Sequence, residues 1–244
     1  MAGELHEKVI LIVGGASGIG LAAAAICAER GARVWIADRD EQAGARAAAQ
    51  VSAEFTRVDV TDEDSVRALF AAVEAGAGRL DVLLQTAGVL RGAYVPLDAF
   101  DLATFRSVLD VNTVGSFLCA RHAAPLLRKA GKGVIVLVSS GAATGGSSSF
   151  AYGTSKGGVN SLGIVLANAL AADAIRVNVV APGNIDTPMK RGVIQADLDR
   201  RSGAENLDTA VAAAGLGDPA GVGRVLAWLA SDDADYVRGL ISTR

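Results

Sequence analysis

The chain has 244 residues, of which 51% are hydrophobic and 20% charged, so it holds enough apolar material for one large α/β domain and is unlike a disordered chain. Its formal net charge of -3, with basic residues scattered along the sequence, disfavours nucleic-acid binding. No stretch approaches the ~20 uninterrupted apolar residues of a membrane helix, and the polar N-terminal flank is unlike a signal peptide, so we expect a soluble, cytoplasmic protein.

Short apolar runs separated by Ala-rich segments predict alternating strands and helices. The runs do not alternate with polar residues, which indicates strands covered on both faces. Gly31 follows the first Ala-rich segment at a natural helix stop. The predicted strands occupy residues 8–13, 32–37, 81–85, 133–138 and 174–183. This order predicts an α/β fold, a single domain (1–244) with a doubly wound, Rossmann-type parallel sheet flanked by helices on both faces.

A glycine cluster, GGASGIG, follows the first strand directly and opens the first helix. Because the chain has 29 glycines, the motif alone is weak, but its position is the one that a phosphate-binding loop requires. We expect Gly14 to allow the tight turn, Gly18 to admit phosphates and Gly20 to let helix and strand pack closely. A turn without a ligand is the alternative.

Acidic residues follow the second and third strands. A carboxylate at Asp38 can accept hydrogen bonds from ribose hydroxyls and would repel a 2′-phosphate, which favours NAD over NADP. Arg39 could instead pair with that phosphate, so NADP stays open. A helix cap or a solvated charge is the alternative role for Asp38. Asp59 and Val60 are expected to close the third strand, and a strand end with a helix cap is their simplest interpretation.

The segment YGTSK places Tyr152 and Lys156 four residues apart, on one face of a predicted helix. An adjacent ammonium stabilises a phenolate and lowers its pKa from about 10, so the pair predicts a proton donor that works near neutral pH. Ordinary neighbours on a solvated helix face are the alternative. Cys27 and Cys119 lie in apolar helical contexts and are expected to act as small hydrophobes, with no metal site.

Two segments between the predicted strands and helices are candidates for an active-site loop and a substrate lid. Residues 141–150, GAATGGSSSF, are interpreted as an active-site loop, with a flexible connector as the alternative. Residues 189–217 have weak periodicity and many small side chains. This irregular stretch is the candidate substrate lid.

Taken together, these motifs resemble the short-chain dehydrogenase/reductase family in its short, single-domain form. The family's motifs appear in order along nearly the whole chain as GGASGIG, AD, DV, TAG, DVNTVG, VSS, YGTSK and APGNIDTPM. The resemblance implies that Tyr152 is the general acid and base, and that Lys156 lowers its pKa and holds the nicotinamide ribose. It also implies that Asn112 binds a water leading from Lys156 to solvent. Ser140 is the expected substrate-orienting serine because it keeps the strand register, although Ser139 would restore the family's usual spacing to Tyr152.

The resemblance also implies where the nucleotide binds. Ile185 and Thr187 would reach the nicotinamide carboxamide, and Pro182 and Gly183 would shape the turn beneath it. The complete implied set is Gly14, Ser17, Gly18, Ile19, Gly20, Asp38, Arg39, Asp59, Val60, Ala87, Gly88, Tyr152, Lys156, Pro182, Gly183, Ile185 and Thr187.

These observations predict an NAD(H)-dependent oxidoreductase that interconverts a secondary alcohol and a ketone by hydride transfer. An NADPH-dependent ketoreductase is the first alternative. The second is a dinucleotide-binding sensor or structural module without chemistry, kept open by Gln85 and Thr86, which stand where the family commonly has two asparagines.

The substrate is expected to be a small alcohol or ketone, and apolar alcohols and polyols are both compatible with the predicted loops. Arg91 and Arg191 are the candidate anion contacts there. The family usually forms tetramers through its long helices, so a homotetramer or dimer is expected through segments 111–127 and 151–171, with core packing as the alternative.

Overall fold

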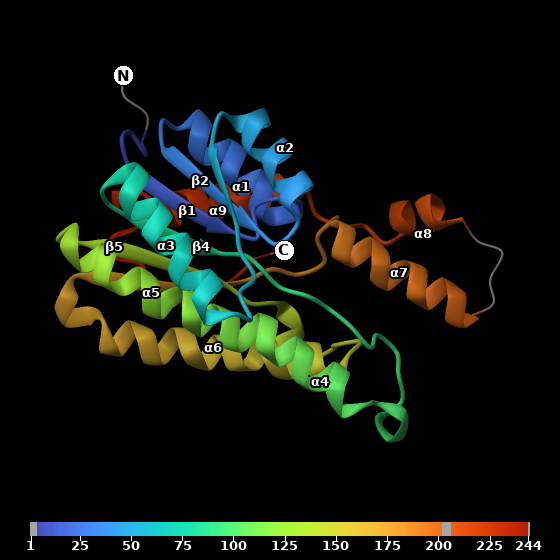
Figure 1. Ribbon diagram of the computed structural model, residues 1–244. Coiled ribbons are helices and arrows are strands. Elements are labelled where there is room, and N and C mark those ends of the chain that lie inside the picture. Colours follow the sequence, from blue (N-terminus) through green and yellow to red (C-terminus); the bar gives the residue numbers. More distant parts are fainter. Residues whose placement is uncertain (1–3, 202–205, 244) are drawn as a thin grey trace.

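The computed structural model describes residues 4–201 and 206–243 and shows helices packed on both faces of one sheet (Figure 1). Within these residues the sheet has seven parallel strands in the order β3-β2-β1-β4-β5-β6-β7. The strands are β1 (Val9–Val13), β2 (Arg33–Asp38), β3 (Glu54–Arg57), β4 (Val82–Gln85), β5 (Gly133–Val138), β6 (Ile175–Ala181) and β7 (Gly239–Ser242). The strand order reverses between β1 and β4, the switch point where doubly wound folds bind ligands.

The helices form two layers and one separate pair (Figure 1). One layer contains α1 (Gly18–Glu29), α2 (Glu41–Val51) and α9 (Pro219–Ala230). The opposite layer contains α3 (Glu63–Ala77), α4 (Leu102–Leu109), α5 (Gly115–Lys129) and α6 (Phe150–Ala169), with one π-helical turn (Asp110–Val114) joining α4 to α5. The pair α7 (Pro188–Arg201) and α8 (Leu207–Ala213) stands beside this body. Short 3-10 turns occupy Leu97–Ala99, Gly141–Ala143, Ala171–Asp173 and Asp232–Ala234.

Successive strand side chains enter two different cores. Leu11 packs with the layer of α3, α5 and α6, whereas Ile10 and Ile12 pack with α1, α2 and α9. All five residues of β1 are buried, which explains why the apolar runs do not alternate with polar residues. The predicted doubly wound sheet with helices on both faces is therefore confirmed, and the five predicted strands match the observed bounds to within one or two residues.

Two local expectations were wrong. Asp59 and Val60 do not close the third strand, because β3 ends at Arg57, where its pairing with Asp38 of β2 ends. The segment 189–217 is not irregular, because α7 and α8 occupy most of its described part. Residues 202–205 within it lie outside the described residues.

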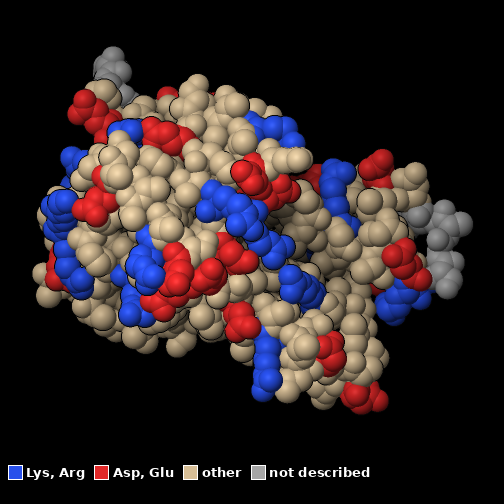
Figure 2. Space-filling model, viewed as in Figure 1, with Lys and Arg blue, Asp and Glu red and all other residues tan. Residues whose placement is uncertain are grey.

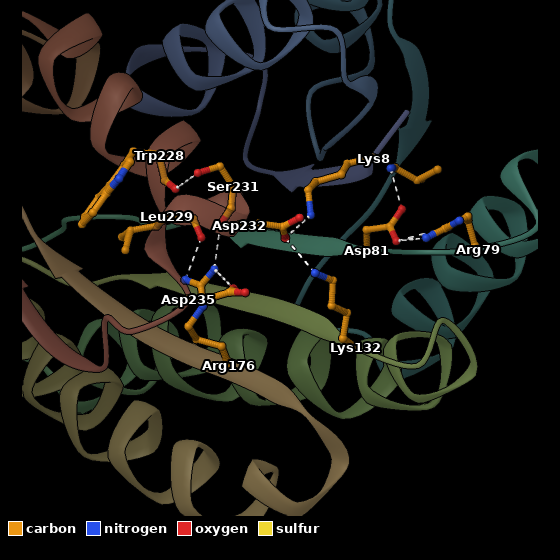
Figure 3. A network of polar contacts seen from close by, with 11 residues as sticks. Lys8, Arg79, Asp81, Lys132, Arg176, Trp228, Leu229, Ser231, Asp232 and Asp235 are labelled. Atoms are coloured by element: carbon orange, nitrogen blue, oxygen red, sulfur yellow. Dashed lines mark hydrogen bonds and ion pairs between the residues drawn. The ribbon is translucent and has the colours of Figure 1, made fainter. Parts of the chain in front are cut away.

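A charged network ties the amino ends of the strands together, at the edge of the sheet opposite the carboxyl ends (Figure 3). Asp232 accepts hydrogen bonds from Lys8 at 2.8 Å and Lys132 at 2.9 Å. The buried guanidinium of Arg176, on β6, donates to the carbonyl oxygens of Leu229 at 2.8 Å and Ser231 at 3.0 Å. These bonds join β1, β5 and β6 to the end of α9, so this edge serves stability.

The described residues carry neither a metal cluster nor a membrane span. No three His, Cys, Asp or Glu side chains among them converge so that they could hold a metal ion. None of their helices combines the length and hydropathy needed to cross a bilayer. Cys27 and Cys119 are free and buried, and burial raises the pKa of each thiol to about 12.

Candidate active site

A cavity of about 570 Å³ opens at the carboxyl ends of the strands, where the visible surface is hollowed beside α7 (Figure 2). Its walls come from segments that follow β1, β2, β3, β4, β5 and β6. All of the predicted catalytic and nucleotide-binding residues except Gly20 and Asn112 line it. Those residues are Gly14, Ser17, Gly18, Ile19, Asp38, Arg39, Asp59, Val60, Ala87, Gly88, Ser140, Tyr152, Lys156, Pro182, Gly183, Ile185 and Thr187.

The glycine-rich turn brings three chain segments to van der Waals distance. Gly14 has a φ of +83°, and a Cβ atom there would lie 2.4 Å from the backbone nitrogen of Ala87. A Cβ atom at Gly20 would lie 2.2 Å from the carbonyl oxygen of Gly14. At Gly18 it would meet the side chain of Thr187 at 3.2 Å. The turn therefore packs against the residues after β4 on one side and against the segment that leads into α7 on the other.

Helix α1 begins without a side-chain cap, unlike its neighbours. Ser17 occupies the N-cap position, but its side chain accepts no hydrogen bond from the first turn. In contrast, Asp40, Asp62 and Asp101 cap α2, α3 and α4. The start of α1 lies on the cavity wall, so its free amides and the positive end of the helix dipole suit a phosphate group.

Asp38 is held in a fixed orientation at the end of β2. Its Oδ2 atom accepts from the amide of Ala16 at 3.1 Å, and Oδ1 accepts from the amide of Asp40 at 3.1 Å. A carboxylate oxygen can accept more than one hydrogen bond, so each retains capacity for a ligand hydroxyl. Arg39 lines the same end of the cavity.

Asp59 and Val60 form the neighbouring wall. Hydrogen bonds from the side chain and backbone of Thr61 hold the pKa of Asp59 below its ordinary value, with a smaller contribution from the charge of Arg39. Asp59 is therefore ionised at neutral pH and can accept from a donor in the cavity. Val60 is buried against Gly115, where a Cβ atom would approach it to 2.7 Å.

Tyr152 and Ser140 both line the cavity. Tyr152 lies in the first turn of α6, where its amide donates to the capping hydroxyl of Ser149 at 3.3 Å. Burial raises the pKa of the Tyr152 phenol, and a hydrogen bond with Ser140 partly opposes this. Ser139 is buried and donates to the carbonyl oxygen of Lys156 at 2.9 Å. Of the two serines, Ser140 is thus the one that contacts the phenol.

Lys156 is buried, and the hydrogen bond found for its ammonium among the described residues is to a backbone carbonyl. Its ammonium donates to the carbonyl oxygen of Val138 at 2.8 Å and lies 5.8 Å from the centre of the Tyr152 ring. Burial lowers the pKa of Lys156 to about 8. The expectation that Lys156 lowers the pKa of Tyr152 stays a prediction; in this structure desolvation raises the pKa of the phenol and the ammonium donates to a backbone carbonyl.

Asn112 lies behind the cavity wall, in the π-helical turn. Its Oδ1 accepts from the amide of Val89 at 2.7 Å, and its Nδ2 donates to the carbonyl oxygen of Val89 and to Ser155 Oγ at 2.9 Å and 2.8 Å. A Cβ atom at Gly88 would lie 3.1 Å from the Lys156 ammonium and 3.2 Å from Asn112 Oδ1. Asn112 therefore joins the segment after β4 to α6. Its Oδ1 atom and the Lys156 ammonium both lie close to Gly88.

The two residues that depart from the family's usual asparagines differ in their contacts. The Thr86 hydroxyl donates to the carbonyl oxygen of Val13 at 2.7 Å, which links β4 to β1 beside the glycine-rich turn. The amide of Gln85 is buried, and among the described residues neither its oxygen nor its nitrogen has a partner.

The two arginines expected as anion contacts do not line the cavity. Arg191 forms a two-point ion pair with Asp186 at 2.7 Å and 2.9 Å, and Arg91 donates to Ser107 Oγ at 2.9 Å. The neighbouring Lys190 does line it. Sequence reasoning missed this lysine because no motif marks it.

Helix α7 reaches the loop after β4 through its far end. The guanidinium of Arg200 lies 5.2 Å from the ring centre of Tyr94, a cation–π contact. Tyr94 has a φ of +62°, and its amide donates to the carbonyl oxygen of Ser148 at 2.7 Å. The three segments around the cavity mouth are therefore connected to one another.

The sequence and the fold are similar to those of several known proteins. A family model described as "Enoyl-(Acyl carrier protein) reductase" matches residues 14–243. Cis-4-hydroxycyclohexanecarboxylate dehydrogenase of Sinomonas cyclohexanicum is 41% identical, covering 99% of this chain and 96% of that protein. Cyclopentanol dehydrogenase of Comamonas testosteroni is 34% identical, covering 97% and 95%. Levodione reductase has a similar crystal structure, with a TM-score of 0.90 and 31% identity, covering 98% and 96%.

Proposed function

Because the chain belongs to the short-chain dehydrogenase/reductase family and is an oxidoreductase acting on alcohols, we propose that it uses NAD(H) to interconvert a ring-borne secondary alcohol and its ketone. The observation that carries the proposal is the Ser140–Tyr152 pair on a cavity that also contains the uncapped start of α1. The names of two relatives, a hydroxycyclohexanecarboxylate dehydrogenase and a cyclopentanol dehydrogenase, support a ring alcohol as the substrate.

The residues present fit a nicotinamide dinucleotide. The amides of Gly18 and Ile19 would hold its pyrophosphate, and Asp38 would accept from its adenosine ribose hydroxyls. Lys156, Ile185 and Thr187 line the same cavity as Tyr152, and the nicotinamide half would bind among them. When bound, the nicotinamide supplies or accepts the hydride.

Tyr152 is the proposed proton carrier at the substrate oxygen. Since burial raises its pKa above the ordinary value of 10.0, the phenol is protonated at neutral pH, which is the form that donates a proton to a ketone oxygen. The Ser140 hydroxyl, already in contact with the phenol, can donate to the same oxygen and stabilise its developing negative charge.

This assignment predicts opposite pH responses in the two directions. Alcohol oxidation needs the phenolate, so its rate should rise as pH increases toward the pKa of Tyr152. Ketone reduction needs the phenol, so its rate should fall only as pH approaches that pKa. Oxidation rates that do not increase between pH 7 and pH 10 would contradict the role of Tyr152.

The proposed preference for NAD over NADP rests on the carboxylate of Asp38. Asp38 would repel a 2′-phosphate, which favours NAD. An NADPH-dependent ketoreductase is the second candidate, favoured by Arg39 on the same end of the cavity. The ratio of kcat/KM for the two nucleotides decides between them.

The direct test is the absorbance of reduced nicotinamide with purified protein, NAD or NADP, and cyclohexanol, cyclopentanol or cis-4-hydroxycyclohexanecarboxylate. We expect turnover with NAD, and a loss of at least about 100-fold in Tyr152→Phe with nucleotide affinity nearly unchanged. Tyr236→Phe is the matched control, because Tyr236 is fully exposed and lines the hollow at the opposite edge of the sheet. Equal turnover in Tyr152→Phe and the wild type would refute the mechanism.

We further propose that α7 and α8 form a lid over the substrate end of the cavity. Met189 and Val193 of α7 line the cavity, and the Arg200–Tyr94 contact joins α7 to the loop after β4. Replacing Arg200 by Met should raise KM more than it lowers kcat. An unchanged KM would argue against the lid.

A homo-oligomer is proposed through the outer faces of α5 and α6. Phe117, Ile164 and Val165 are apolar side chains that are 45%, 56% and 59% exposed. Burying them against a second copy would remove apolar surface from water. Sedimentation of Ile164→Asp beside the wild type tests this, and identical assembly in both proteins would contradict it.

A further inference from the structure

The charges on the cavity wall are distributed unevenly. Asp38 and Asp59 lie at the proposed nucleotide end together with Arg39, whose charge lowers the pKa of Asp59. The ammonium of Lys156 is already bonded to a backbone carbonyl. Lys190 is the remaining lysine of the wall, and it comes from α7 rather than from the edge of the sheet.

Lys190 shares α7 with three apolar residues that also line the cavity. Met189, Val193 and Pro188 of the same helix line the cavity with it, and Leu90 comes from the loop after β4. Among the ion pairs and hydrogen bonds between described residues, none includes the Lys190 ammonium, whereas the adjacent Arg191 is engaged by Asp186. A half-buried cation beside apolar residues of its own helix suits a ligand with an apolar body and one anionic group.

We propose that Lys190 is a specificity-determining residue that binds a carboxylate carried by the substrate ring. This inference deepens the proposed function and rests on it for the identity of the ring. A relative 41% identical over 99% of this chain is named for a hydroxycyclohexanecarboxylate, a ring that carries both an alcohol and a carboxylate. Lys190 would select such a substrate over a neutral ring alcohol of similar size.

An anion near Lys190 could also come from the nucleotide. Thr187 and Pro188, which precede Lys190, contact Gly18 at the proposed pyrophosphate site. The shared chemistry is an oxyanion bound by an ammonium, and the two sources differ in which ligand loses affinity when the charge is removed. The test therefore measures both ligands separately.

The experiment is calorimetric titration of cyclohexanecarboxylate and its neutral isostere cyclohexanecarboxamide into the protein saturated with NADH. We expect the wild type to bind the carboxylate at least tenfold more tightly, which corresponds to about 1.4 kcal/mol. Lys190→Met should remove this preference, and Lys190→Arg should keep most of it. Lys129→Met is the matched control, because Lys129 pairs with Glu74 on the outside of α5.

Three results would overturn the proposal. The first is a wild type without preference for the carboxylate, and the second is a preference that survives in Lys190→Met. The third is an at least tenfold loss of NADH affinity in Lys190→Met with the carboxylate preference intact, which would assign the lysine to the pyrophosphate. These titrations need no turnover, so a failure of the proposed dehydrogenase activity would be seen separately, in the absorbance assay.

Discussion

Replacing Lys156 by Met should make the protein more stable while removing a group of the proposed active site. The Lys156 ammonium is buried, and its only close polar partner among the described residues is the carbonyl oxygen of Val138, so no acidic side chain offsets its desolvation. Buried charges without a counterion oppose folding. The substitution keeps the length of the side chain and removes the charge.

The size of the effect follows from the pKa of Lys156, which falls from its ordinary value of 10.5 to about 8. A difference of that size corresponds to about 3 kcal/mol of destabilisation when the group is charged in both the folded and unfolded states, below pH 8. Loss of the hydrogen bond to Val138 should offset about 1 to 2 kcal/mol of the gain. We therefore expect Lys156→Met to raise the free energy of unfolding by about 1 to 2 kcal/mol at pH 7.

The pH dependence separates this cause from better packing. Between pH 8 and 10.5 the unfolded wild type binds more protons at Lys156 than the folded wild type, so wild-type stability rises with pH through this window. The difference in free energy of unfolding between Lys156→Met and the wild type should fall by about 2 to 3 kcal/mol between pH 7 and pH 10. At the higher pH the wild type can therefore be the more stable protein. Urea unfolding of both proteins at the two pH values measures it. A variant less stable at pH 7, or a difference independent of pH, would refute the reasoning.

Three further predictions test the packing and the site. Gly20→Ala would place Cβ 2.2 Å from a backbone oxygen and should cost about 1 to 3 kcal/mol in urea unfolding, whereas Gly157→Ala, in open space on α6, should stabilise by about 0.5 to 1 kcal/mol. Ser140→Ala should lower kcat about 100-fold, while Ser139→Ala should mainly lower stability, by about 1 kcal/mol; the reverse pattern would exchange the two serines. Asp38→Ser should narrow the preference for NAD over NADP at least tenfold, and an unchanged ratio of kcat/KM would contradict its role.

Five strands could be predicted because each forms a continuous buried apolar run, and their bounds were found to within one or two residues. The end of β3 was misplaced because its residues are only partly buried and form no such run. Helix α7 beside the cavity could not be found from apolar periodicity. In α7 only Val193 and Leu198 are buried, so the helix has no wide apolar stripe to detect. Its last turn is supported instead by ion pairs of Asp197 with Arg200 and Arg201.

The cavity-lining residues could be predicted where a motif is local, as in the turn at Gly14 or the pair Tyr152 and Lys156. Their mutual contacts depend on segments far apart in the sequence. Whether the Lys156 ammonium meets a phenol or the Val138 carbonyl depends on how β5 packs against α6. Likewise, adjacent helix residues point about 100° apart, so the helix start decides whether Lys190 or Arg191 faces the cavity.

The π-helical turn at Asp110–Val114 makes the length of this part of the chain as important as its composition. Such a turn amounts to one extra residue in an otherwise continuous α-helix from α4 to α5. Deleting one residue there would restore regular α-helical winding, and the side chains of α4 would rotate by about 100° relative to those of α5. Either Asn112 would swing away from Val89 and Ser155, or the buried face of α5 would turn away from the sheet. Relatives that keep both contacts should therefore tolerate substitutions in this turn far more readily than insertions or deletions.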